Sequence, residues 1–237
     1  MSSTTKSKQP RFSLILIILA VISVILGIQL FGGKGTPPII QIPAPEGDSD
    51  STAVPIVASQ IPARFLIGIV SGHRGYDPGA VCDDGLTEAD VNYAVAVEVV
   101  DLLTRRGGQA DLLDEFDERL TDYQADALIS IHADSCNILG ATGFKTARVT
   151  DSAIPEAEDK LVACLNREYA TATGLTPHPG SITDGMTDYH AFNQIDPQTP
   201  GAIIETGFLL DDRALLAERP KIVARGIAAG ILCFLEE

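Results

Sequence analysis

The sequence predicts an α/β protein: a three-layer α/β/α sandwich with a largely parallel central sheet, preceded by one transmembrane helix. Two observations predict the sandwich. Short apolar runs rich in Ile, Leu and Val alternate with longer segments whose apolar residues recur at helical spacing. This alternation is typical of parallel sheets, because the helices return the chain to the same edge. A third observation, an uncharged apolar run near the N-terminus, predicts the transmembrane helix.

The N-terminal apolar run is FSLILIILAVISVILGIQLF, residues 12–31. A helix of about 20 residues spans a hydrocarbon core of ~30 Å. Because basic residues precede the run, at Lys6, Lys8 and Arg11, we expect residues 1–11 to form a cytoplasmic tail, with the rest extracellular or periplasmic. A cleaved signal peptide is the alternative, although this run is longer than a signal core and lacks a good cleavage site. A buried core helix would be shorter or amphipathic.

The composition changes after the apolar run. Residues 32–62 are rich in Pro, Gly, Ser and Asp, and few of them are able to form a core. They are predicted to form an extended linker that holds a domain away from the membrane. Residues 63–237 are predicted to form a single folded domain.

The folded domain is expected to begin with a strand and a long helix. RFLIGIV (64–70) is a continuous apolar run ended by Ser-Gly, as in a buried strand. A helix is predicted over 88–108, because Thr87 is suited to cap it and apolar residues recur on one face. The Gly107-Gly108 pair is expected to end this helix.

The middle of the domain alternates again. QADLL (109–113) predicts a short strand, and DEFDERLTDYQ (114–124) is interpreted as a helix with a solvated, charged face. ADALISIHAD (125–134) is a second clear buried strand, and TGFKTARV (142–149) alternates like a strand.

The C-terminal part repeats the pattern. A helix is predicted over 154–174, with a proline near its start and a glycine at its end. The polar, Gly- and Pro-rich residues 175–199 are expected to form a surface loop. PGAIIETGF (200–208) is a third clear strand, and residues 219–237 close the domain as an apolar helix.

The net charge and the cysteine spacing argue against a nucleic-acid partner and against a zinc site made of cysteines. A net charge of −15 repels a phosphate backbone, so no nucleic-acid partner is expected. The four cysteines show no C-x-x-C spacing, which argues against a thiolate zinc site. Cys164 and Cys233 fall on apolar helix faces and are interpreted as buried free thiols. Cys82 and Cys136 lie in loops, where an exported domain allows a disulfide, but the sequence leaves the pairing open.

Four polar residues gather at one predicted edge of the sheet. His73 follows the first strand, Glu88 opens the first long helix, His132 ends the second clear strand and Glu205 lies in the last strand. Ligands bind beyond the carboxyl ends of parallel strands. Taken singly, each histidine can be explained as a residue that makes hydrogen bonds in a loop, and Glu88 as a carboxylate that stabilises the positive end of a helix dipole. Glu205 is harder to explain, because a buried carboxylate is costly unless it is paired or functional.

Taken together, these residues have the chemistry of a hydrolytic zinc site. Zn²⁺ accepts imidazole nitrogens and carboxylate oxygens, and catalytic sites leave one position open. His73, Glu88 and His132 would supply a His₂Glu set for one Zn²⁺ per chain. Glu205 would be free to act as a general base, taking a proton from water and passing it to a leaving amine. This combination points to hydrolysis of an amide.

Four motifs resemble one enzyme family. GHRGYDPGAV, GLTEADVN, SIHAD and PGAIIETGFLLD are similar to the motif blocks of the zinc-dependent N-acetylmuramoyl-L-alanine amidases of the AmiC/CwlV type. In order and approximate spacing they span Phe65 to Glu237. The resemblance implies a zinc amidase catalytic domain at residues 63–237 that cleaves peptidoglycan between muramic acid and the L-alanine of the stem peptide.

The resemblance also assigns roles to individual residues. It implies that His73, Glu88 and His132 are the zinc ligands and that Glu205 is the catalytic glutamate. Where this chain departs from the family pattern, Arg74 and Asp134 are weak candidates for substrate contacts. The threonine-arginine pair that commonly follows the second strand is missing.

Two other interpretations remain open. A wall-binding or regulatory module of the same fold would lack activity, although all four site residues are present. A zinc peptidase or another amide hydrolase would use a similar site on a different substrate. His178 and His190, in the predicted surface loop, are not expected to bind metal.

Overall fold

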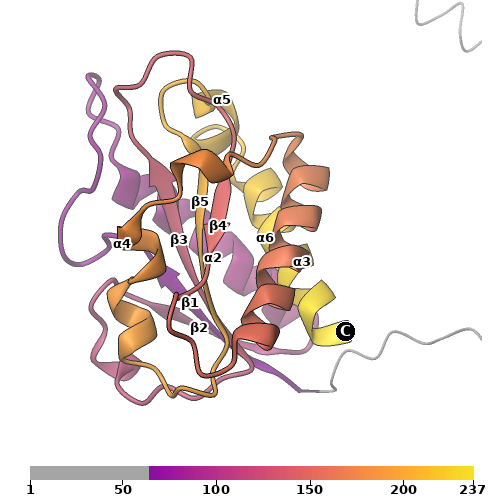
Figure 1. The fold of residues 1–237 in the computed structure, drawn as a ribbon. Helices are drawn as coiled ribbons and strands as arrows, with labels where there is room; N and C mark the ends of the chain where they lie inside the picture. Colours follow the sequence, from indigo (N-terminus) through magenta and orange to yellow (C-terminus); the bar gives the residue numbers. More distant parts are fainter. Residues whose placement is uncertain (1–63) are drawn as a thin grey trace, which may run out of the picture. The chain divides into compact units, whose positions relative to one another are not determined.

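The computed structural model describes residues 64–237 (Figure 1). The predicted cytoplasmic tail, the predicted transmembrane helix at 12–31 and the predicted linker at 32–62 lie outside the described residues. Within residues 64–237, every helix is too short or too polar to cross a membrane.

A five-stranded sheet lies at the centre of the described domain, in the order β2-β1-β3-β5-β4. Its neighbours pair in parallel, except β4, which runs antiparallel to β5. The largely parallel sheet is therefore confirmed. The strands are β1 (Leu66–Ser71), β2 (Gln109–Leu113), β3 (Ala127–Asp134), β4 (Lys145–Ala147) and β5 (Gly201–Phe208).

Three long helices cover one face of the sheet, and short helical turns cover the other. The long helices are α2 (Glu88–Arg105), α3 (Pro155–Thr173) and α6 (Pro220–Glu236). The short elements on the second face are η1 (Glu118–Leu120), η2 (Pro179–Ser181), α4 (Asp184–Thr187) and η3 (His190–Asn193), whereas α5 (Arg213–Leu216) packs on the side of the long helices. Met186 of α4 and Ala191 of η3 pack on the second face with Leu120 of η1. The predicted sandwich is therefore present, with a thin second outer layer.

The two faces follow from the alternation of side chains along each strand. Ile69 of β1, Ile129 of β3 and Ile204 of β5 pack under the long helices. Their sequence neighbours, such as Val70 and Ile203, pack under the short elements instead. Burial on both faces explains why these strands are continuous apolar runs.

The helix predicted over 114–124 is wrong. Only the turn η1 forms there. The Asp117 carboxylate accepts hydrogen bonds from the backbone N–H groups of Asp114 and Arg119, and also pairs with the Arg119 guanidinium. Aspartate side chains that bond to nearby backbone favour turns over helix interiors, so this segment folds back toward the edge of the sheet.

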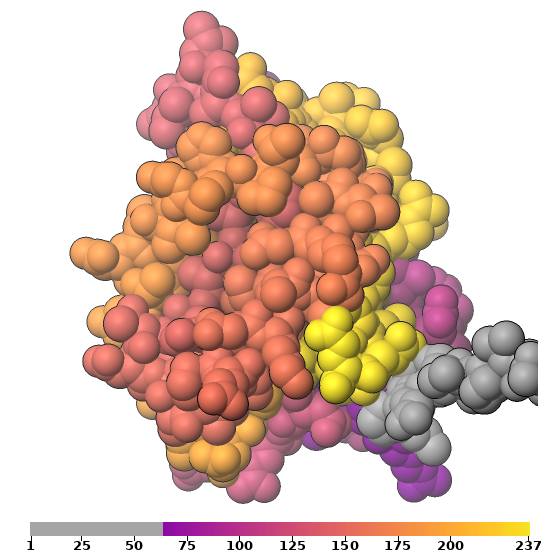
Figure 2. Space-filling view, turned by 45° about the vertical axis from the view of Figure 1, so that its right-hand side comes forward, coloured from indigo at the N-terminus to yellow at the C-terminus, as the bar shows by residue number. Residues whose placement is uncertain are grey.

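Helices α3 and α6 pack closely, and a disulfide joins them. Figure 2 shows the end of α6, in yellow, against α3. A side chain at Gly230 would lie 2.8 Å from the backbone of Leu165, so the small residue is required for this approach. Cys164 and Cys233 face each other across this contact and form a disulfide. Their interpretation as free thiols is therefore wrong, because sequence periodicity gives a helix face but not its partner.

A second disulfide links Cys82, in the loop between β1 and α2, to Cys136, just after β3. The two bridges close loops with sequence separations of 54 and 69 residues. Bridges of this span restrict the unfolded chain and typically stabilise a domain by about 2–4 kcal/mol each. The Cys82–Cys136 bridge also ties together the two segments that carry the candidate site.

Candidate active site

His73 lies in a tight turn just beyond β1. Its own φ is 65°, a left-handed backbone conformation that is uncommon for any residue except glycine. Its backbone N–H donates to Glu115 Oε2 at 2.6 Å, and the N–H of Asp77 donates to its carbonyl at 3.1 Å. These bonds hold a conformation that costs about 1–3 kcal/mol where it occurs. Strained backbone of this kind is common at functional sites.

Two glycines allow the site side chains to meet. A Cβ on Gly72 would lie 2.4 Å from Cε1 of His132, well inside contact distance. A Cβ on Gly79 would lie 2.7 Å from Glu88 Oε2 and 2.8 Å from Cδ2 of His73. Because side chains at these two positions would occupy the space of the site residues, the turn after β1 must be built with glycine there.

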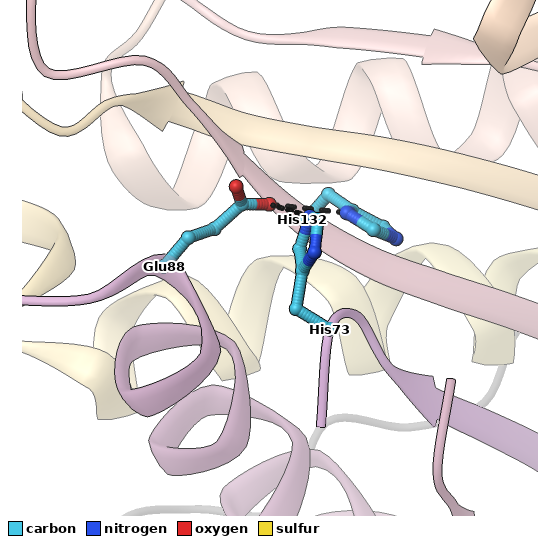
Figure 3. Close-up of side chains that lie close together, drawn as sticks. All are labelled: His73, Glu88 and His132. Carbon is cyan, nitrogen blue, oxygen red and sulfur yellow. Dashed lines mark hydrogen bonds and ion pairs between the residues drawn. The ribbon is translucent and has the colours of Figure 1, made fainter. Parts of the chain in front are cut away.

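Glu88 is the first residue of α2, which Thr87 caps by accepting the N–H of Asp90. The side chain of Glu88 is buried. Its Oε2 accepts the N–H of Ala80 at 3.1 Å, and its Oε1 accepts the N–H of Ala133 at 3.2 Å. The loop before α2 and the strand β3 thus fix the carboxylate, which points away from the helix toward the two histidines (Figure 3).

The side chains of His73, Glu88 and His132 converge on one point. Glu88 Oε1 lies 3.2 Å from His73 Nε2 and 3.0 Å from His132 Nδ1. The three residues offer ligand atoms that all lie within 4.8 Å of one another. Figure 3 shows both rings directed at the same carboxylate. The predicted grouping of these three residues is present in the structure, and two imidazoles with one carboxylate form a donor set that fits a zinc-like ion.

In the absence of metal, the electrostatic interactions within this group favour protonated histidines and an ionised Glu88. The hydrogen bond to Glu88 raises the pKa of His73 to about 9, against the opposing effect of burial. Burial lowers the pKa of His132, but the hydrogen bond to Glu88 and the charges of the nearby carboxylates outweigh burial. The pKa of His132 is therefore above its ordinary value. Burial raises the pKa of Glu88, yet its hydrogen bonds to both histidines outweigh this and lower it. A metal ion would therefore compete with protons for both rings.

The second nitrogen of each ring faces another carboxylate. His73 Nδ1 donates to Asp77 Oδ1 at 2.6 Å, and His132 Nε2 lies 3.5 Å from Glu115 Oε2. Asp77 also accepts the N–H of Gly79, as expected for a residue that shapes the turn. Carboxylates in this position fix the orientation and tautomer of metal-binding histidines. Both rings are thus held with one nitrogen toward Glu88.

Glu115 is a site residue that was not predicted, because it fell within the charged segment interpreted as a solvated helix. It lies two residues beyond β2 and is only about 6% exposed. Its Oε1 accepts hydrogen bonds from Tyr189 OH and His190 Nε2, both at 2.9 Å. Burial raises its pKa, but these donors and the nearby His132 lower it to about 2. The rule that selected His73 and His132 also points to the end of β2, but it does not distinguish Glu115 from Asp114 and Asp117 beside it.

Glu205 lies in β5, directly beside His132 in the register of β3 and β5. Its Oε2 is buried and has no hydrogen-bond partner among residues 64–237. Removal from water is the largest cause that raises the pKa of Glu205 to about 7, with further contributions from Glu88 and Asp134. His132 and Lys145 act in the opposite direction. A carboxyl group with a free buried oxygen and a pKa near neutrality is suited to exchanging protons.

We expect the stability of the metal-free protein to fall between pH 5 and pH 8, in part because of Glu205. The ordinary pKa of its carboxyl group is 4.5 and its folded value is about 7, so the folded protein keeps a proton that the unfolded chain has lost. The resulting stabilisation is complete below pH 4.5 and is lost as the pH rises through 7, a difference of roughly 2–3 kcal/mol.

Urea unfolding of the chelator-treated protein at both pH values measures this effect. Glu205→Gln should remove that part of the pH dependence, while the contribution of His73, lost between pH 6.5 and about 9, should persist. An equal pH dependence in the wild type and in Glu205→Gln would contradict the assignment.

The candidate substrate-contact residues lie on opposite sides of this centre. Arg74 pairs with Asp114 at 3.0 Å and its guanidinium lies 4.6 Å from the centre of the Tyr93 ring. Asp134 ends β3 and accepts from Lys145 Nζ at 2.6 Å. The structure places neither in the three-residue group, and their role toward substrate stays a prediction.

The other two histidines lie outside the three-residue group. His178 Nδ1 contacts the Ser181 hydroxyl at 2.8 Å, and His190 binds Glu115. His190 is nevertheless closer to the centre than a surface-loop residue was expected to be. It shares the Glu115 carboxylate with Tyr189, whose hydroxyl lies 3.5 Å from His132 Nε2.

An open groove of about 590 Å³ lies at the β4 and β5 side of the sheet. Asp134, Lys145 and Phe208 line it together with Ile138 and Leu139. The last two belong to the loop between β3 and β4, where Leu139 is 87% exposed. Because Lys145 pairs with Glu205 in the register of β4 and β5, the groove lies next to the strand that carries the unpaired carboxyl group.

Comparison with known sequences identifies the family of this chain. The profile of the Amidase_3 family, described as N-acetylmuramoyl-L-alanine amidase, matches residues 67–233. A putative N-acetylmuramoyl-L-alanine amidase of Buchnera aphidicola is 36% identical over 92 residues, which is 33% of this chain. The match covers only 39% of the length of that relative.

Solved structures show the same fold. AmiC2, an N-acetylmuramoyl-L-alanine amidase of Nostoc punctiforme, is 25% identical and superposes with a TM-score of 0.57 over 73% of this chain and 98% of its own. The CwlD amidase of Clostridioides difficile, solved in complex with the GerS lipoprotein, is 22% identical with a TM-score of 0.60, over 72% of this chain and 98% of its own.

Proposed function

Because the chain belongs to the N-acetylmuramoyl-L-alanine amidase family, we propose that it is a peptidoglycan hydrolase. The bond cleaved is the amide between N-acetylmuramic acid and the L-alanine of the stem peptide. The observation that carries this proposal is the convergence of His73, Glu88 and His132 beside Glu205, whose buried Oε2 has no hydrogen-bond partner in the described domain.

The proposed cofactor is one Zn²⁺ per chain, held by His73 Nε2, a Glu88 carboxylate oxygen and His132 Nδ1. These donors fit zinc because the other nitrogen of each ring already faces a carboxylate, which leaves the inner nitrogen for a metal. When bound, zinc lowers the pKa of water toward about 7 and polarises a carbonyl group.

Glu205 is the proposed general base and then general acid. As a carboxylate, its Oε2 takes a proton from the attacking water and passes it to the nitrogen of the leaving L-alanine. Such proton transfer typically contributes about 10²–10⁴ in rate. The buried position of Oε2 supports this role, because no protein donor in the described domain competes for it.

The proposed location of the catalytic domain is outside the cytoplasm, with residues 12–31 as the membrane anchor and 32–62 as the linker. Two disulfides support it, since such bonds persist mainly in oxidising compartments. Peptidoglycan, the proposed substrate, lies in the same compartment, so an outward-facing domain on a linker would reach it.

Digestion of purified peptidoglycan by the full chain tests the proposal. We expect release of free stem peptides with an N-terminal L-alanine, loss of this release with a chelator, and recovery on adding zinc. Full activity in metal-free protein would overturn the zinc mechanism. Cleavage at another amide would support a different zinc hydrolase, and intact zinc binding without any cleavage would support a silent wall-binding module.

Glu115→Gln is predicted to weaken zinc binding by about 10- to 100-fold, a range typical of residues that orient metal-binding histidines. The neutral amide loses the negative charge that faces His132 Nε2. It also places an N–H₂ group against the donors Tyr189 and His190. Competition with a chromogenic chelator measures the zinc dissociation constant.

Glu118→Gln is the matched control for this prediction, because Glu118 is exposed and lies three residues further on. It should bind zinc like the wild type. Equal zinc affinity in Glu115→Gln and the wild type would show that Glu115 does not support the metal site.

A further inference from the structure

A series of aromatic rings leads from the metal ligands to the surface. The His132 ring contacts Tyr189 with centroids 5.6 Å apart, and Tyr189 contacts His190 at 4.5 Å. His190 stacks on Phe116 at 4.2 Å, and Phe116 meets the ring of Tyr76 at 4.6 Å. The series begins at a buried histidine and ends in two rings that are largely in water.

The two outer rings are exposed and well supported. Tyr76 is 68% exposed and Phe116 is 52% exposed. Single exposed apolar residues are common, whereas contiguous exposed apolar surface marks binding sites, and these two rings are in contact with each other. The backbone N–H of Tyr76 donates to the carbonyl of His73, and the N–H of Glu115 donates to the carbonyl of Arg74. The rings are thus tied to the same two loops that build the metal site.

The sheet order places this pair opposite the groove. Tyr76 follows β1 and Phe116 follows β2, at one edge of the sheet. The groove with Asp134 and Lys145 lies at the β4 side, beyond Glu205 on β5. The metal ligands therefore stand between an aromatic surface and a charged groove.

We propose that Tyr76 and Phe116 form a sugar-binding surface for the glycan strand of peptidoglycan, and that the bound stem peptide extends toward the groove at Lys145. This inference rests on the proposed function, because the scissile amide joins a sugar to a peptide. With the amide at the metal ligands, the two halves of the substrate extend to opposite sides.

The chemistry of each side decides which half lies there. A pyranose ring presents a face of C–H bonds, which packs on the electron-rich face of an aromatic ring. The exposed Tyr76 and Phe116 offer this kind of surface. The groove is lined by the ion pair of Lys145 with Asp134 and by apolar side chains, a mixture that matches the polar and methyl groups of a peptide. The glycan is therefore assigned to the aromatic side.

Binding to the catalytically inactive Glu205→Gln full chain tests the proposal without turnover. The probe is a peptide-free tetrasaccharide of alternating N-acetylglucosamine and N-acetylmuramic acid. Calorimetry should give a dissociation constant that rises roughly 3- to 10-fold in Tyr76→Ala and in Phe116→Ala. Val97→Ala removes an exposed apolar side chain of α2 that takes no part in the series, and should leave the affinity unchanged.

A fluorescent variant gives an independent readout. The chain contains no tryptophan, so Tyr76→Trp introduces a single reporter that keeps an aromatic face. The tetrasaccharide should shift the emission of this variant, and a synthetic stem tripeptide beginning with L-alanine should not. Unchanged affinity in both alanine variants would overturn the proposal. So would an emission shift in Tyr76→Trp that follows the tripeptide in place of the sugar.

Hydrolysis separates this proposal from the proposed function. In the active background, Tyr76→Ala with Phe116→Ala should raise KM for peptidoglycan with little change in kcat, as for lost binding that is equal in ground and transition states. If the wild type is active and the double variant has the same KM, only the proposal of a sugar-binding surface is overturned. A wild type without amidase activity would overturn the proposed function, while the tetrasaccharide titration would still report on the surface.

Discussion

Glu205→Gln should lower kcat for stem-peptide release by about 10²–10⁴, the usual contribution of general acid–base catalysis. The amide has nearly the same shape as the carboxyl group but cannot take a proton from water. Glu205 lies beside His132 in the sheet and is not part of the three-residue group. Zinc content should therefore stay at about one ion per chain, and only the proton transfer should be lost.

Three measurements on this variant separate catalysis from folding. Zinc content and the unfolding midpoint of Glu205→Gln should match or exceed those of the wild type, since the buried carboxyl group carries a cost when ionised. Glu205→Asp keeps a carboxylate one methylene further back and should recover part of the activity. Glu218→Gln, on the exposed surface, should behave as the wild type. A Glu205→Gln variant with full activity would show that another group moves the proton.

His132→Ala should abolish both zinc binding and activity, and is the second large effect. The ring carries one of the three proposed ligand atoms and packs against Gly72 in the turn that carries His73. With two ligands left, zinc content after dialysis should fall well below the wild-type value of about one per chain. Activity should fall by at least about 10³, because both the activated water and the polarised carbonyl are lost.

His178→Ala is the matched control, because His178 contacts Ser181 and stands outside the ligand group. It should keep its zinc. Addition of excess zinc to His132→Ala should restore little activity, in contrast to chelator-treated wild type, which should recover. If His132→Ala retained one zinc per chain, the assignment of the ligands would be wrong.

His73 and His132 were predictable because strand ends can be recognised in the sequence. An apolar run that stops at His73 or His132 shows both the strand and the polar residue that follows it. Glu205 was recognisable for a different reason, since a carboxylate inside AIIETGF is costly without a function. Parallel pairing of β1, β3 and β5 then brings these residues to one edge of the sheet.

Glu115 and the Cys164–Cys233 bridge were not predictable in the same way. Glu115 is surrounded by other acidic residues, and its charge pattern is that of a solvated helix. Its burial depends on donors that lie 42 to 75 positions away, at His73, Tyr189 and His190. The disulfide depends on which face of α3 meets α6, and helical periodicity does not contain this pairing.

The sequence by itself determined the α/β alternation, the strands that end at the site, and the three candidate ligands with their nearby glutamate. These follow from local rules, because hydrophobic period and burial cost are properties of a short stretch of chain. Only the tertiary structure decided that Gly72 and Gly79 make room for the site, that Glu115 supports both histidines, and that Tyr76 and Phe116 form one surface. The physical reason is distance along the chain: contacts between remote segments arise from packing, which no local pattern encodes.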